Sequence, residues 1–302
     1  MQTYTTQMDA ARKGIVTPQM ETVAKKEYRT VEEIRQLVAE GKVAIPANKH
    51  HECLNPEGIG SMLRTKINVN LGVSRDCKDY NIEMQKVMSA VNMGAEAIMD
   101  LSSHGNTQPF RQKLTHECPV MIGTVPVYDS VIHYQRDLAT LTAQDFIDVV
   151  RLHAEDGVDF VTLHCGITRK TIEQIRKHKR KMNIVSRGGS LVFAWMCMTG
   201  NENPFYEHFD EILDICEEHD VTISLGDACR PGCHRRLPDR RAGASGRANQ
   251  AGLGAQRPGH GGRPWPCASE PGRRQHGDPE DHLHGRTFLR PRPPRHRHRP
   301  RL

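Results

Sequence analysis

Short apolar runs alternate with amphipathic stretches from Lys66 to Leu225, and this alternation is the clearest pattern in the chain. Short runs rich in Val, Ile and Leu that end at Gly, Pro or polar residues are typical of buried strands. Strands are therefore predicted at Ile67–Leu71, Ala97–Leu101, Val120–Val125, Phe160–His164, Ile184–Ser186 and Val221–Leu225.

Helices are predicted where apolar residues recur every three to four positions between helix start and stop signals. An early short helix begins at Thr30, in a Thr-Val-Glu-Glu capping-box pattern, and ends near Gly41. Four more are expected between the strands: from about Asp79 to Gly94 with Ile82, Val87, Met88 and Val91 on one face, from Thr142 to Gly157, over about Thr171–Lys181, and over about Phe205–His219.

Six β–α steps of this kind predict a parallel sheet covered by helices, and an α/β TIM-type (β/α)8 barrel is the usual form of such a sheet. About six units are two short of a closed barrel, so the expected barrel is incomplete. It would occupy residues 65–233, after an N-terminal segment at 1–64. A doubly wound sheet is the alternative, but the Gly-rich phosphate-binding pattern is missing after the first strand, where Gly72 stands alone.

The composition changes sharply after Cys233. Residues 234–302 contain no Val, Ile, Met, Tyr or Lys and hold ten of the eighteen prolines. Sixteen Arg against five acids give this tail +11 of net charge, so the first 233 residues carry −5 of the total of +6. A segment without branched aliphatic residues cannot bury enough apolar surface to offset its ordering entropy, so the tail is expected to be disordered.

The composition of residues 234–302 has two interpretations. An Arg-rich nucleic-acid-binding segment would usually carry Lys or interleaved aromatic residues, and only Trp265 and Phe288 are present. Read one base later, synonymous codons for Arg247–Gln275 permit a text containing EGPGH, and those for His284–Leu302 permit GAPFYVLGPLVTDIAPG. The recovered text is protein-like, so we infer a one-base insertion near the codon for Cys233 or His234, which makes 234–302 an out-of-frame tail.

Polar or reactive side chains follow the end of each predicted strand, and the C-terminal strand ends of a barrel meet at one face. Singly, each has a plain structural reading: His164 as a satisfied core histidine, and Arg187 and Arg230 as surface ion-pair partners. Together they predict a pocket for a phosphorylated small molecule, because Ser-Arg-Gly-Gly at a strand end resembles an anion cradle. The candidates are Asn70, Met99, Tyr128, His164, Ser186, Arg187, Gly188, Asp227 and Arg230.

The location is expected to be cytoplasmic, with no membrane partner. The chain has no run of 18 apolar residues, and its N-terminus lacks the apolar stretch of a secretory signal. Nine scattered cysteines without a CxxC pair favour a reducing compartment.

Eight short sequence motifs follow one another along the chain: ARKGIVTPQM, IPANKHH, KINVNLG, AIMDLSSHG, IGTVPVY, DFVTLHCG, IVSRGGS and ISLGDACRPGC. In these motifs the chain resembles the phosphomethylpyrimidine synthase family of thiamine biosynthesis, from about residue 11 to Cys233, and the shifted text extends the resemblance. The resemblance implies a (β/α)8 enzyme, usually a homodimer. Its reaction would be the radical conversion of 5-aminoimidazole ribotide to hydroxymethylpyrimidine phosphate, a lyase reaction that uses S-adenosylmethionine and a [4Fe–4S] cluster.

By motif match, the nine candidate residues fall on the family's substrate-contacting positions. The family's ligands for a zinc-type divalent metal lie in EGPGH and after DIAPGY, and its cluster cysteines follow a CxxC-x4-C spacing. The chain as given has none of these, so no metal or cluster ligand is assigned and this chain is expected to be inactive. The alternatives are a barrel lyase that needs no cluster and an Arg-rich nucleic-acid-binding protein.

Overall fold

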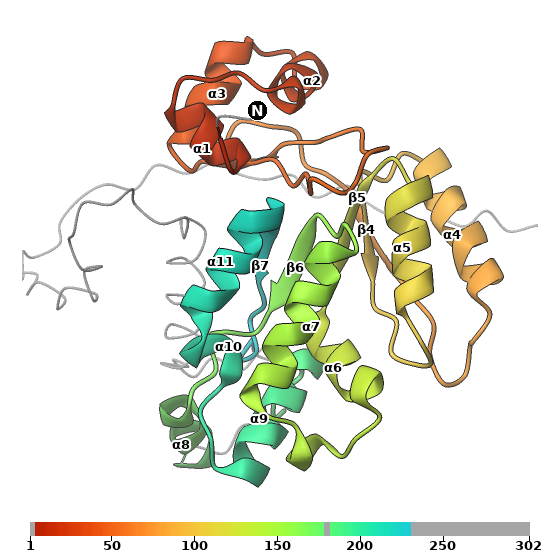
Figure 1. The fold of residues 1–302 in the computed structure, drawn as a ribbon, viewed down its shortest axis with the longest axis vertical. Helices are drawn as coiled ribbons and strands as arrows, with labels where there is room; N and C mark the ends of the chain where they lie inside the picture. The colour runs from red at the N-terminus through yellow and green to blue at the C-terminus, as the bar shows by residue number, and fades with distance from the viewer. Residues whose placement is uncertain (1–3, 178–181, 231–302) are drawn as a thin grey trace, which may run out of the picture. The chain divides into compact units, whose positions relative to one another are not determined.

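The computed structural model describes residues 4–177 and 182–230, drawn in colour in Figure 1. All of them belong to one compact unit, Met1–Arg257, and the second unit, Pro258–Leu302, lies outside the described residues. The prediction of a disordered tail over 234–302 also falls outside them.

A five-stranded parallel sheet forms the centre of the described chain (Figure 1). Its strands follow chain order: β3 (Asn68–Leu71), β4 (Ala97–Asp100), β5 (Met121–Thr124), β6 (Phe160–Leu163) and β7 (Thr222–Leu225). Each pairs with the next in parallel register. The predicted α/β class with a parallel sheet is confirmed, and five of the six predicted strands lie where the apolar runs placed them.

The prediction of the remaining strand, Ile184–Ser186, was wrong. Thr222–Leu225 pairs with Phe160–Leu163 along its whole length, so no edge of β6 remains for a strand between them. Ser186 instead caps helix α9 (Arg187–Thr199), its hydroxyl accepting from the Gly189 N–H at 3.1 Å. The segment therefore ends in a helix start, with Ser190 Oγ donating to the Ile184 carbonyl at 3.1 Å.

The connecting helices agree with the prediction only in part. Three lie close to the predicted ranges: α4 (Tyr80–Asn92), α7 (Ala143–Glu155) and α8 (Arg169–Lys177). The predicted helix over Phe205–His219 is two helices, α10 (Pro204–Glu207) and α11 (Phe209–His219), because His208 leaves helical geometry. Three of the helices between the strands were not predicted, namely α5 (Gln108–Glu117), α6 (Pro126–Tyr134) and α9. A short 3₁₀ turn spans Leu138–Thr140.

The apolar face predicted for α4 was also partly wrong. Ile82 and Met88 are exposed, whereas Met84, Val87 and Ala90 are buried against the sheet and α5. The buried stripe includes Glu83, whose carboxylate accepts from the Gly72 N–H at 3.1 Å. A charged residue with a specific backbone partner thus takes a core position that hydrophobic periodicity could not indicate.

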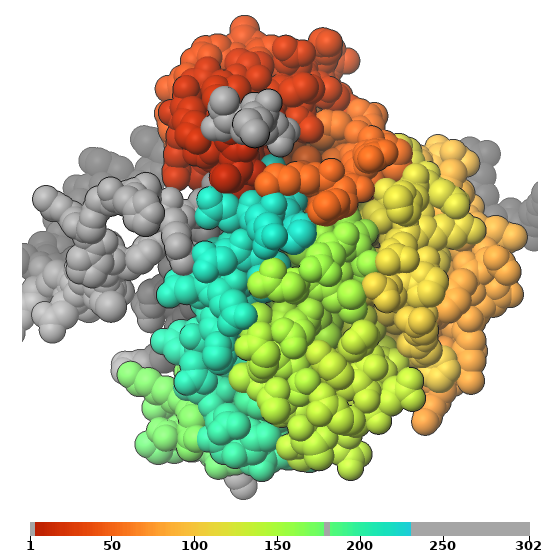
Figure 2. Space-filling view, viewed as in Figure 1, coloured from red at the N-terminus to blue at the C-terminus, as the bar shows by residue number. Residues whose placement is uncertain are grey.

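The N-terminal part has an apolar cluster of its own. Helices α1 (Gln7–Arg12), α2 (Pro18–Lys26) and α3 (Val31–Ala39) enclose it with the two-stranded pair β1 (Val43–Ala44) and β2 (Ile59–Gly60). The predicted capping box at Thr30 is confirmed, since Thr30 and Glu33 each accept from the other's backbone N–H. Figure 2 shows these residues, in red and orange, packed against the teal end of α11, where Gln7 N–H donates to Asp220 at 3.0 Å.

Asp159, directly before β6, ties the loop after β1 to the amino end of the sheet. Its buried carboxylate accepts from the backbone N–H groups of Asn48 and Ile122 and pairs with His51 Nδ1 at 2.7 Å. A cavity of about 380 Å³ lies at this end, lined by residues of α1, α2 and the loop and by Asp220. None of the predicted site residues lines it, so the candidate site must be sought at the other end of the strands.

Candidate functional site

The strand register places the candidate residues of β3 and β4 side by side. Asn70 pairs with Met99, Met99 with Gly123, and Gly123 with Phe160, so these four lie in one row on one face of the sheet. Gly123 is required there, because a Cβ would collide with the Phe160 ring. Since side chains alternate along a strand, His164, four residues beyond Phe160, belongs to the same face.

His164 lies at the centre of the site, just after β6. Its ring is buried, with 4% of the residue exposed, and its Nε2 is 2.9 Å from Ser186 Oγ. Gly188 and Gly226 pack against the ring, and an added Cβ would lie 2.7 Å from Nδ1 at the first and 2.9 Å from Nε2 at the second. The first turn of α9 therefore closes on the carboxyl ends of β6 and β7.

Tyr128 brings helix α6 into the same group. The Arg187 guanidinium lies over its ring, 4.7 Å from the centroid. Burial raises the pKa of the Tyr128 phenol, while the Arg187 charge and a backbone hydrogen bond with Gly188 act in the opposite direction. The phenol is therefore neutral and lies beside an exposed cation at the N-terminus of a 13-residue helix.

Asp227 and Arg230 complete the group from the segment after β7. The Arg230 guanidinium donates to the Asp227 carbonyl at 3.2 Å, and Asp227 Oδ1 accepts from the Cys229 N–H at 2.8 Å. Burial lowers the pKa of His164 to about 4, with Arg230 lowering it further and Asp227 acting against this. His164 is therefore a neutral imidazole at neutral pH.

The structure thus brings together seven of the nine predicted residues, from Tyr128 to Arg230, around one buried imidazole. The other two, Asn70 and Met99, share its face of the sheet, and Met99 belongs to the apolar cluster against which Tyr128 packs. The set offers two guanidinium groups, a phenol and helix N–H groups, which suits an anion attached to a hydrogen-bonding ring.

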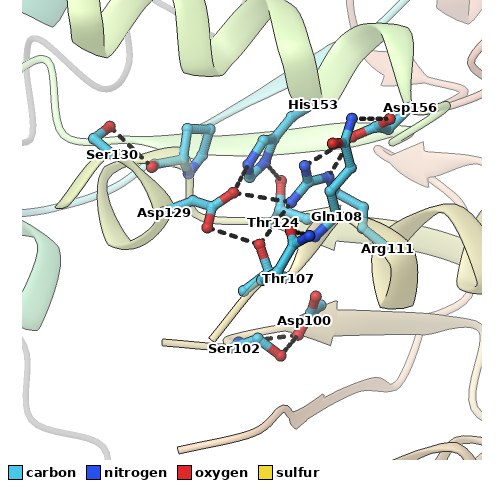
Figure 3. A network of polar contacts seen from close by, with 12 residues as sticks. Asp100, Ser102, Thr107, Gln108, Arg111, Thr124, Asp129, Ser130, His153 and Asp156 are labelled. Carbon is cyan, nitrogen blue, oxygen red and sulfur yellow. Dashed lines mark hydrogen bonds and ion pairs between the residues drawn. The ribbon is translucent and has the colours of Figure 1, made fainter. Parts of the chain in front are cut away.

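A second polar network, which was not predicted, includes Asp129, the residue after Tyr128 (Figure 3). Arg111 of α5 is 1% exposed and pairs with Asp129 of α6 at 3.1 Å and with Asp156 at 2.7 Å. His153 of α7 joins Asp129 through Nε2 at 3.1 Å and Thr124 of β5 through Nδ1 at 2.8 Å. Because Asp129 follows Tyr128 in the chain, the network fixes the turn of α6 that carries the phenol.

The charges in this network are settled by burial and by its hydrogen bonds. Burial raises the pKa of Asp129, but the contacts with His153, Arg111 and Thr107 outweigh it and hold that pKa well below its usual range. Burial and the nearby Arg111 lower the pKa of His153 to about 4. Asp129 is therefore ionised and His153 neutral. Its Nε2–H donates to the Asp129 carboxylate, and its Nδ1 accepts from the Thr124 hydroxyl.

We expect His153 to make the protein less stable in mild acid. Its folded pKa of about 4 lies below the ordinary 6.5, so its stabilising contribution is present above pH 6.5 and is lost as the pH falls toward 4. Between pH 6.5 and 5, the loss from this one group is about 1.5 kcal/mol of unfolding free energy.

Urea unfolding at these two pH values checks this result. His153→Gln should flatten the pH dependence by that amount, whereas His133→Gln, at an exposed position, should leave it unchanged. An unchanged slope in His153→Gln would mean that the buried imidazole is not held neutral.

An iron–sulfur cluster requires three thiolates close together, and the described cysteines do not provide them. Burial raises the pKa of the Cys216 thiol to about 12 and raises that of Cys165 strongly, so both remain thiols. Within 4–177 and 182–230, no three His, Cys, Asp or Glu side chains are grouped to hold a metal ion. The described residues therefore do not fit a cluster. They also include no helix long and apolar enough to cross a membrane.

Comparison with known proteins decides the family. The model of the radical SAM ThiC family matches residues 6–245, well over half of the chain. The chain belongs to the radical SAM ThiC family. Its similarity to the phosphomethylpyrimidine synthase of Clostridium novyi (strain NT) is 61% identity over 230 residues, which is 76% of this chain and 53% of that protein.

Two further relatives agree. The phosphomethylpyrimidine synthase of Clostridioides difficile (strain 630) is 59% identical over 236 residues, 78% of this chain and 54% of its own length. The one from Clostridium botulinum (strain Loch Maree / Type A3) is 60% identical over 230 residues, 76% of this chain and 53% of its own length. This member of the ThiC family therefore spans about half the length of the curated relatives it matches. The comparisons give no support to the cluster-independent lyase or the nucleic-acid-binding alternative.

Proposed function

We propose that the group around His164 binds 5-aminoimidazole ribotide, as part of an enzyme that makes the thiamine pyrimidine. One observation carries this proposal: Arg187, at the N-terminus of α9, stacks on Tyr128 beside a neutral, buried His164. The resemblance to the family assigns these three residues to substrate contact. Together they supply a cation and helix N–H groups for a phosphate, and a phenol and an imidazole for the ring or ribose.

Each residue has a role that follows from its place. Arg187 and the backbone of Ser186 and Gly188 lie at the helix terminus and would hold the phosphate. Asn70, Tyr128 and His164 would hydrogen-bond the ribose and imidazole, with Met99 against the ring. Asp227 and Arg230 would orient the ribose end. When bound, S-adenosylmethionine and a [4Fe–4S] cluster would supply the radical, but the described residues do not group the side chains that a cluster needs.

We also propose that residues 65–233 are the front part of a (β/α)8 barrel, after an N-terminal segment at 1–64, in an enzyme that is cytoplasmic and dimeric when intact. The out-of-frame interpretation of 234–302 rests on the change of composition after Cys233 and on the family text recovered one base later. Resequencing the gene across the codons for 232–240 tests this reading. Loss of one base would restore the family frame, and a confirmed extra base would mean a broken gene.

Binding of the ribotide tests the proposed function directly. We expect Arg187→Met to weaken its affinity for the full chain at least about tenfold, because one charge-assisted contact with a phosphate is worth roughly 1.5–3 kcal/mol. Isothermal titration measures this. Arg151→Met is the matched control, since Arg151 is a partly exposed arginine of α7 whose partner is Glu218 at 3.3 Å. Equal affinities in the two variants, or no binding by a folded wild-type chain, would contradict the proposal.

A further inference from the structure

The hydrogen bonds around Ser186 determine which nitrogen of His164 carries the proton. Ser186 Oγ accepts from the Gly189 N–H at 3.1 Å and lies 2.9 Å from His164 Nε2. Among the residues that the structure describes, His164 Nδ1 is buried and has no hydrogen-bond partner. Within the described residues, the imidazole therefore has one hydrogen-bonded nitrogen, Nε2, and one nitrogen without a hydrogen bond, Nδ1.

Two arrangements of the protons are possible, and they differ in cost. If the Ser186 hydroxyl donates to Nε2, the serine is satisfied as donor and acceptor, and only the Nδ1–H lacks a partner. If Nε2–H donates to Ser186 instead, both the serine proton and the Nδ1 lone pair lack one. Each unmet buried group costs about 1–3 kcal/mol, so the first arrangement is favoured.

We propose that Ser186 is a positioning residue that acts through His164, holding the neutral ring as the Nδ1–H tautomer. His164 then offers a hydrogen-bond donor beside Gly188, and the ligand atom it suits is an acceptor, such as a phosphate or ribose oxygen. In this state Nδ1 cannot accept a proton, so it cannot act as a base. The ligand part of this inference rests on the proposed function; the tautomer does not.

The low pKa of the ring keeps His164 neutral, so the ring carries one proton, whereas a protonated imidazole would carry two. The hydrogen bonds of Ser186 then decide which nitrogen holds that proton. Burial is the main cause of the low pKa, and the charges that act on the ring are Arg230, which lowers the pKa, and Asp227, which raises it. The side chain of Ser186 is already committed to the cap of α9 and to His164. Its effect on a ligand is therefore indirect, unlike that of Arg187.

Long-range ¹H–¹⁵N NMR of the full 302-residue chain, labelled at histidine, reads the tautomer directly. The signals of His164 are identified by their loss in His164→Gln. We expect a protonated Nδ1 and a bare Nε2, a shift toward the Nε2–H form in Ser186→Ala, and restoration in Ser186→Thr, which keeps both the hydroxyl and the cap. A wild-type ring protonated at Nε2 would overturn the inference, even if Ser186→Ala failed to fold.

Adding 5-aminoimidazole ribotide separates this inference from the proposed function. If the ribotide binds, the Nδ1–H signal should shift, and Ser186→Ala should weaken binding about tenfold while Ser186→Thr stays within about threefold of wild type. A ring found in the Nδ1–H form that does not respond to the ribotide would refute the proposed ligand and leave the role of Ser186 standing. Binding with an Nε2–H ring would do the reverse.

Discussion

Replacing Arg111 by Met is expected to lower the free energy of unfolding by about 3–5 kcal/mol, the usual cost of removing one partner from a buried ion pair. Arg111 is 1% exposed, and its guanidinium contacts Asp129 at 3.1 Å and Asp156 at 2.7 Å. Without it, two carboxylates remain in the interior with no cation between them. Their hydrogen bonds from Thr107, His153 and Gln108 do not neutralise this charge.

Urea unfolding followed by circular dichroism measures this loss. Arg151→Met is again the matched control: the Arg151–Glu218 pair is 41% and 62% exposed, so its removal should cost less than about 1 kcal/mol. A similar small loss in both variants would mean that water reaches the Arg111 network. The double variant Arg111→Met/Asp156→Asn should recover part of the loss, because it leaves one buried carboxylate fewer.

The same substitution links stability to the site. Asp129 and Tyr128 are neighbours in the first turn of α6. The Asp129 carboxylate contacts Arg111 of α5, His153 of α7 and Thr107, the residue before α5. Tyr128 lies under the Arg187 guanidinium. Loss of Arg111 should therefore weaken ribotide binding as well, under conditions in which the variant is still folded.

The central strands of the sheet could be predicted because each is a short, mostly buried and mostly apolar run. Ala97–Asp100 and Met121–Thr124 are buried at every position, as expected for a parallel sheet with both faces covered. The placement of the candidate site followed from the same pattern, since it needed only the strand ends. His164 and Asp227 lie at those ends, as predicted.

The interior contacts could not be predicted, because they join residues far apart in the chain. Arg111, Asp129 and His153 come from three different helices, and nothing in their spacing indicates that they meet. The segment Ile184–Ser186 is apolar enough for a strand, yet whether it forms one depends on a free sheet edge, which β7 occupies. In both cases tertiary pairing overrides the local pattern.

Gly188→Ala is expected to disrupt the site more than any single side-chain truncation. An added Cβ would lie 2.7 Å from His164 Nδ1 and closer still to Cε1, and Gly226 blocks the ring from retreating on another side. Either the ring or the first turn of α9 must move. Overpacking of this kind costs about 1–3 kcal/mol of stability, and displacement of His164 and Arg187 together should reduce ribotide affinity by at least about thirtyfold.

Gly200→Ala, at the C-cap of α9, separates this clash from the general cost of replacing a glycine near this helix. Gly200 has φ of +76° and nothing within 4 Å of an added Cβ, so its replacement should cost about 1 kcal/mol through backbone strain and leave binding unchanged. Ribotide affinity near that of wild type in Gly188→Ala would show that the first turn of α9 does not close on His164. The other outcome is that Gly188→Ala alone loses ribotide affinity while keeping a cooperative thermal unfolding transition. That result would place ligand recognition at the contact between Gly188 and His164, because α9 would still be folded but no longer aligned with the end of β6.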